Sequence, residues 1–136
     1  MTKIAWRRQM SVGQPTIDED HKHLIGYLND LGDALDAPKF PPVRVAKVLA
    51  ALLEYTHDHF SREEKMMVQA RYPDYDAHVL KHREAVRVIA SLANSFSKEP
   101  TRVNAERLYN FTAEWLVRHI IMEDSKLAPY VRGLWI

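Results

Sequence analysis

The sequence predicts an all-α protein, an up-down-up-down four-helix bundle with an N-terminal arm. Three observations support this fold. Proline and glycine gather in short segments that divide the 136 residues into four long stretches. Within each stretch, apolar residues recur at spacings of three and four, as in a helix with one buried face. The alternating β-branched runs and Asn-Gly pairs that mark strands and hairpins are missing from the sequence. Four amphipathic helices joined by short loops favour antiparallel neighbours.

The arm covers residues 1–15 and carries Trp6 among its apolar side chains, so we expect it to pack across the bundle. The first helix is expected over residues 17–36. Thr16 is its candidate N-cap, and Glu19 would complete a capping box.

Three further stretches share the helical periodicity and are separated by segments that contain proline. We expect helices over residues 43–70, 76–97, and 103–124 or beyond. A chain of 136 residues is within the usual size of one domain, so residues 1–136 are expected to form a single domain.

Composition excludes several classes of protein. The chain has 19 Lys and Arg against 18 Asp and Glu, which is not the basic excess of a nucleic-acid or membrane-surface binder. The absence of cysteine excludes disulfides, thiolate zinc sites and iron–sulfur clusters. No apolar run approaches the roughly 20 residues of a membrane helix, and no signal peptide is recognisable. We therefore expect a cytoplasmic protein with no nucleic-acid or membrane partner.

Titratable side chains interrupt the apolar faces of all four helices. His59 and Glu63, and likewise His78 and His82, are spaced i, i+4, which places each pair one above the other on its helix. The complete set comprises five histidines and two carboxylates: His21, His59, Glu63, His78, His82, His119 and Asp124.

Burial of these seven groups requires compensation. Each buried charge costs several kcal/mol, and the net stability of a domain is only about 5–15 kcal/mol. Because no matching core-facing lysines or arginines are present, we infer two bound divalent cations. Seven ligands are too many for one structural zinc, and this donor set suits iron, zinc, copper or nickel better than calcium or magnesium. His23 and His57 lie about 200° around their helices from the neighbouring ligands and should be exposed.

The ordered motifs resemble the hemerythrin family, specifically its single-domain bacterial members. The resemblance extends from about Trp6 to Tyr130. Its motifs are Ile17-Asp18-Glu19-Asp20-His21, His59-Phe60-x-x-Glu63-Glu64, His78-x-x-x-His82, and Trp115-Leu116-x-x-His119-Ile120-x-x-x-Asp124.

This resemblance implies a non-heme di-iron centre, two Fe ions that cycle between Fe2+ and Fe3+. By position, one iron would be bound by His78, His82 and His119 and would be coordinatively saturated. The other would be bound by His21 and His59 and would keep one position open for O2.

The resemblance also implies that Glu63 and Asp124 bridge both irons together with an oxo or hydroxo group. Glu123 directly precedes Asp124 and could compete as a carboxylate, but the family's position matches Asp124. An apolar pocket for O2 is expected from neighbours of the ligands, although these are equally suited to an ordinary core. They are Leu24, Ile25, Phe60, Trp115, Leu116 and Met122.

The expected function is reversible O2 binding, as an oxygen carrier, store or buffer, with an O2-consuming recipient protein as a further partner. The chain lacks the Glu-x-x-His pairs of carboxylate-rich bundles that activate oxygen, which favours binding over enzymatic turnover. The alternatives are an O2- or redox-sensing module, a di-iron enzyme acting on peroxide or nitric oxide, and a structural zinc bundle.

Overall fold

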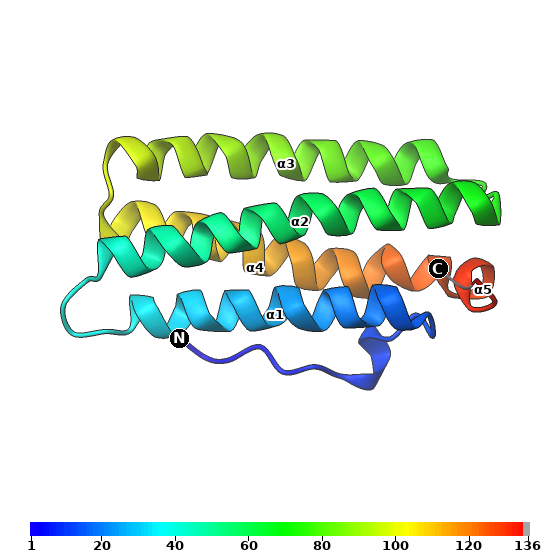
Figure 1. Ribbon diagram of the computed structural model, residues 1–136, viewed down its shortest axis with the longest axis horizontal. Coiled ribbons are helices and arrows are strands. Elements are labelled where there is room, and N and C mark those ends of the chain that lie inside the picture. Colours follow the sequence, from blue (N-terminus) through cyan, green and yellow to red (C-terminus); the bar gives the residue numbers. More distant parts are fainter. Residues whose placement is uncertain (135–136) are drawn as a thin grey trace.

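The computed structural model describes residues 1–134 and consists of four long antiparallel helices with short elements at both ends (Figure 1). The first and the third long helices each pack against the second and the fourth, so the bundle is closed. No strand occurs in residues 1–134, and the predicted fold class is confirmed. The long helices are α1 (Pro15–Leu35), α2 (Pro42–Ala70), α3 (Tyr75–Lys98) and α4 (Arg102–Met122).

The helices bury the apolar faces that the sequence periodicity predicts. Leu24, Leu28 and Leu31 of α1 are fully buried against Leu52 of α2 and Leu108 of α4. Burial of each such side chain stabilises the fold by about 1.5–3 kcal/mol. None of the helices in the described part of the chain is long and apolar enough to cross a membrane.

The N-terminal arm lies along α1, beneath it in Figure 1. The backbone of Ile4 is hydrogen-bonded in both directions to the side chain of Asn29, at 2.8 and 2.9 Å. Trp6 packs half-buried against the core, and Met10 and Val12 are fully buried. The short 3-10 helix η1 (Arg8–Met10) turns the arm back toward the start of α1.

Helix α1 begins earlier than predicted, and its cap is a different residue. The side-chain oxygen of Gln14 accepts a hydrogen bond from the backbone N–H of Ile17 at 2.9 Å. Pro15 occupies the first helical position, where the missing N–H costs nothing and the fixed φ suits the helix. Thr16 therefore lies inside the first turn, and the predicted capping box with Glu19 is wrong.

This difference gives a paired stability test. Gln14→Ala removes the cap and should lower the free energy of unfolding by about 1 kcal/mol. Thr16→Ala should change it by no more than about 0.5 kcal/mol, as expected of a site without a cap. Urea denaturation of the two variants decides between them, and a larger loss in Thr16→Ala than in Gln14→Ala would contradict the observed cap.

The chain leaves the α-helical path directly after Met122, in contrast to the predicted helix through residue 124. It continues as the 3-10 helix η2 (Asp124–Leu127) and the short helix α5 (Ala128–Val131). Pro129 lies in the first turn of α5, where its missing N–H is tolerated, and it prevents α4 from continuing unbroken through residue 129 because its ring would clash with the carbonyl of Ser125. The change matters for the site: in an uninterrupted helix, Asp124 would lie about 140° from His119.

Candidate metal centre

All seven predicted ligands lie together in the interior of the bundle, and every one is buried. The four long helices and η2 all contribute. They supply His21 from α1, His59 and Glu63 from α2, His78 and His82 from α3, His119 from α4, and Asp124 from η2.

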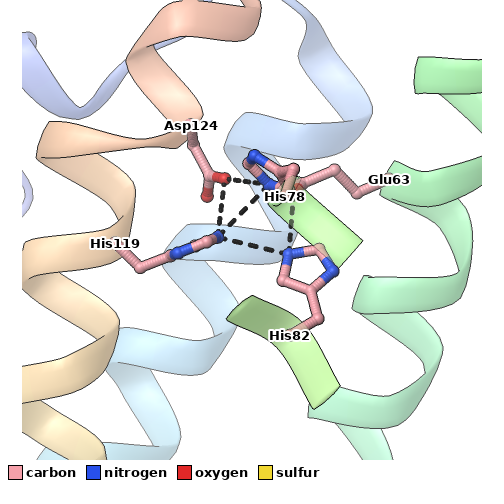
Figure 2. Close-up of side chains that lie close together, drawn as sticks. All are labelled: Glu63, His78, His82, His119 and Asp124. Carbon is pink, nitrogen blue, oxygen red and sulfur yellow. Dashed lines mark hydrogen bonds and ion pairs between the residues drawn. The ribbon is translucent and has the colours of Figure 1, made fainter. Parts of the chain in front are cut away.

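Five of these side chains form the first cluster, which Figure 2 shows in close-up. The Nε2 atom of His119 lies 3.2 Å from Nε2 of His82 and 3.3 Å from Nε2 of His78. His78 Nε2 is also 2.7 Å from Glu63 Oε1 and 3.0 Å from Asp124 Oδ1. Three imidazole nitrogens that face one another cannot all be paired as donor and acceptor, whereas a shared cation accepts all three lone pairs.

The second cluster contains His21 and His59 and shares both carboxylates with the first. His21 Nε2 lies 2.9 Å from Asp124 Oδ2 and 3.8 Å from Glu63 Oε2. His59 Nε2 lies 3.4 Å from the same Glu63 oxygen. Each carboxylate thus directs one oxygen toward each group of histidines.

Unpaired buried atoms show that the residues fit a pair of cations. Within residues 1–134, both ring nitrogens of His21, Oε2 of Glu63 and Oδ1 of Asp124 are buried without a hydrogen-bond partner. Such atoms are costly to bury, and metal coordination satisfies nitrogen and carboxylate oxygen alike. In each cluster the candidate ligand atoms all lie within 4.8 Å of one another. Imidazole with some carboxylate is a donor set suited to iron and other transition metals.

In the metal-free chain, protons on the histidines partly balance the negative charge of the buried carboxylates. Burial lowers the pKa of His78, but the adjacent carboxylates of Asp124 and Glu63 raise it to about 10. Burial also lowers the pKa of His59, yet its hydrogen bond to Asp20 and the adjacent carboxylate of Glu63 raise it to about 9. Burial raises the pKa of Asp124, and His119 and other histidines hold it well below its usual value. Metal binding must therefore displace protons.

A carboxylate that the sequence analysis did not select supports His59 from behind. Asp20 Oδ2 accepts from His59 Nδ1 at 3.0 Å. Arg62 donates to both Asp20 oxygens at 2.9 Å, and the Tyr55 hydroxyl donates to Oδ1 at 2.8 Å. Burial raises the pKa of Asp20, but these donors bring it well below its usual value, so Asp20 is an anion. The sequence does contain a signal for the burial of Asp20, because it lies four residues before the buried Leu24 and so shares its helix face.

The first cluster has outer contacts of a different kind. Glu64 accepts a hydrogen bond from His82 Nδ1 at 2.8 Å. The Phe60 ring stacks on His82 at 3.9 Å between centroids, and the Trp115 ring stacks on His119 at 4.3 Å. These contacts restrict the rotation of two imidazoles.

Five of the six residues expected to line an apolar pocket lie in the bundle interior or at its edge. Leu24, Ile25, Phe60 and Leu116 are buried, and Trp115 is half-buried. The prediction for Met122 is wrong, since its side chain is 59% exposed. Met122 lies two residues, about 200°, beyond the buried Ile120 and so faces outward.

The residues expected to lie outside the site do so. His23 and His57 are exposed. The Glu123 carboxylate is partly buried but pairs with two lysines instead of the histidines, 3.4 Å from Lys81 Nζ and 3.3 Å from Lys126 Nζ, so it does not compete with Asp124.

Comparison with known proteins gives concordant matches. The family model described as "Hemerythrin HHE cation binding domain" matches residues 12–131. The bacteriohemerythrin of Stenotrophomonas maltophilia is 27% identical over 133 residues, covering 98% of this chain and 84% of the relative. That of Methylococcus capsulatus is 33% identical over 112 residues, covering 82% and 83%. A crystal structure of wild-type hemerythrin superposes with a TM-score of 0.87 at 28% identity, covering 97% of this chain and all of the other. The chain therefore belongs to the hemerythrin HHE cation-binding domain family.

Proposed function

We propose that this protein binds O2 reversibly at a pair of iron ions. The proposed ligands are the seven buried residues, with both carboxylates shared between the ions: His21, His59, Glu63, His78, His82, His119 and Asp124. Reversible binding would let the protein act as a carrier, store or buffer of O2. We propose that it does so in the cytoplasm, with an O2-consuming protein as the recipient.

The observation that carries this proposal is the uneven division of the ligands. One cluster offers five side chains, and the other offers four. The ion beside His21 and His59 therefore has fewer protein ligands, which favours an external ligand at that position. When bound, a ferrous pair supplies the electrons that O2 takes up on binding and returns on release.

The chain's own residues suit reversibility. Imidazoles are neutral donors, so five of the seven ligands add no negative charge, which favours the ferrous pair over the ferric one. Carboxylate-rich bundles with Glu-x-x-His motifs are instead built around a more anionic donor set. Leu24, Ile25 and Leu116 are buried in the core and help to exclude water. Binding is thus favoured over an enzymatic reaction with O2.

An absorption spectrum tests the proposal. Iron-loaded protein is reduced without air, and O2 is then added and removed over several cycles. We expect iron charge-transfer bands that appear and vanish with O2. Bands that appear once and decay to a ferric form would contradict reversible binding, as would a colourless protein that contains only zinc.

A further inference from the structure

A buried hydrogen-bond network connects His59 to the surface of α2. Asp20 is at its centre and is only 4% exposed, whereas the Arg62 side chain is 37% exposed. Asp20 belongs to α1 and Arg62 to α2, and the packing of these two helices brings the side chains together. His59 and Arg62 lie three residues apart and therefore share one face of α2.

The geometry leaves the Asp20 carboxylate little freedom. Arg62 Nε donates to Oδ2 and Arg62 Nη2 to Oδ1, each at 2.9 Å, which is a bidentate pair. Tyr55 donates to Oδ1 as well, and the guanidinium of Arg62 lies 5.4 Å from the centre of the Tyr55 ring. Because the planar guanidinium bonds both carboxylate oxygens, it fixes the plane of the carboxylate, which the single ammonium group of a lysine could not do.

This fixed carboxylate determines how His59 is presented to the site. His59 Nδ1 donates its proton to Asp20 Oδ2 at 3.0 Å. In the neutral imidazole that binds a metal, Nε2 is then the unprotonated nitrogen; it lies 3.4 Å from Oε2 of the shared carboxylate of Glu63. Hydrogen bonds of this type select the tautomer and the ring orientation that a metal ligand needs.

The opposite cluster has a weaker version of this arrangement. Glu64 accepts from His82 Nδ1 at 2.8 Å, but its side chain is 29% exposed. Among the described residues, no arginine or lysine pairs with Glu64, whereas Asp20 accepts four hydrogen bonds from three side chains. The two clusters therefore differ in how firmly a histidine is held from behind.

We propose that Arg62 is a positioning residue for the metal ion beside His21 and His59, and that it acts through Asp20. This inference rests on the proposed metal centre. Arg62 touches neither the ion nor O2; it holds Asp20, which orients His59. Its loss should weaken one of two metal-binding steps and leave the other unchanged.

The test is a Co2+ titration of the full-length metal-free protein, followed by the absorption of the bound ion. Loss of an outer-layer partner typically lowers metal affinity by 10- to 100-fold. The ion beside His21 and His59 has fewer protein ligands and should bind in the weaker of the two steps. For Arg62→Gln we expect the Co2+ affinity of this step alone to fall about tenfold. Tyr55→Phe removes one hydroxyl and should act in the same direction with a smaller loss. Arg44→Gln, an exposed site on the same helix, is the matched control and should bind as the wild type does.

A second readout separates positioning from general stability. In zinc-loaded, 15N-labelled protein, the Nδ1 proton of His59 should be protected from exchange in the wild type and in Arg44→Gln. It should exchange faster in Arg62→Gln. Equal weakening of both steps, together with a lower melting temperature, would mean a merely structural role and would overturn the inference. Unchanged Co2+ affinities in Arg62→Gln would overturn it too while leaving the proposed function intact. A wild type that binds fewer than two Co2+ ions would overturn both.

Discussion

Replacement of Glu63 by glutamine should reduce the iron retained by the protein from two ions per chain to one or none, and should abolish the O2-dependent absorption. Glu63 is the side chain on which both clusters depend. Its Oε1 lies 2.7 Å from His78 Nε2 and 3.1 Å from His82 Nε2, and its Oε2 lies 3.4 Å from His59 Nε2. An amide carries no charge and turns an N–H group toward one set of imidazole lone pairs.

Iron analysis after dialysis against a chelator measures this effect, and the absorption spectrum in the presence of O2 complements it. The matched control is Glu54→Gln, an exposed carboxylate on the same helix, which should retain both ions. A Glu63→Gln protein that keeps two irons and still cycles with O2 would rule out the bridging role.

Removal of the metal should make stability strongly dependent on pH. In the metal-free chain, the pKa of His59 is raised to about 9 and that of His78 to about 10 by neighbouring carboxylates. A group whose pKa is higher in the folded state stabilises the protein fully below its unfolded pKa, here about 6.5, and loses this effect as the pH rises through the folded value. Stability should therefore fall between about pH 6.5 and pH 10.

The opposite limb follows from the carboxylates. Asp124 has a lowered pKa, so its stabilising effect is present above its unfolded value near 4 and is lost as the pH falls further. The metal-free protein should thus be most stable at mildly acidic pH.

Thermal unfolding across this range is the measurement. We expect the metal-free melting temperature to drop by at least about 5 °C from pH 6.5 to pH 10, the size of shift caused by about 1–2 kcal/mol. The metal-loaded protein should lack this drop, because bound metal replaces the protons. A metal-free protein whose melting temperature is constant across that range would contradict the charge pairing in the site.

The sequence was sufficient for the fold and for where the ligand candidates lie because both depend on regular helix geometry. The i, i+4 pairs His59–Glu63 and His78–His82 lie on the same helix faces as the buried apolar residues of α2 and α3. This phase relation holds within each helix and needs no knowledge of the rest of the chain.

Features that depend on departures from a helix, or on contacts between helices, could not be predicted in the same way. Asp124 reaches the site only because the chain changes to a 3-10 turn after Met122. The cap at Gln14 depends on how the arm enters α1. The partnership of Asp20 with Arg62 joins residues 42 positions apart, which no local pattern encodes. Proximity to His119 in the sequence predicts Met122 in the pocket, whereas its helix phase directs it outward.

The stoichiometry of O2 uptake tests the central claim most directly. A pair of irons with a single open position should bind one O2 per chain, and therefore one O2 for every two irons. Oxygen uptake by reduced protein of known iron content, with release under vacuum or argon, gives this ratio. We predict a ratio of one O2 to two irons that is recovered over repeated cycles. One O2 for each iron, or uptake that is never released, would contradict a paired, reversible O2 site.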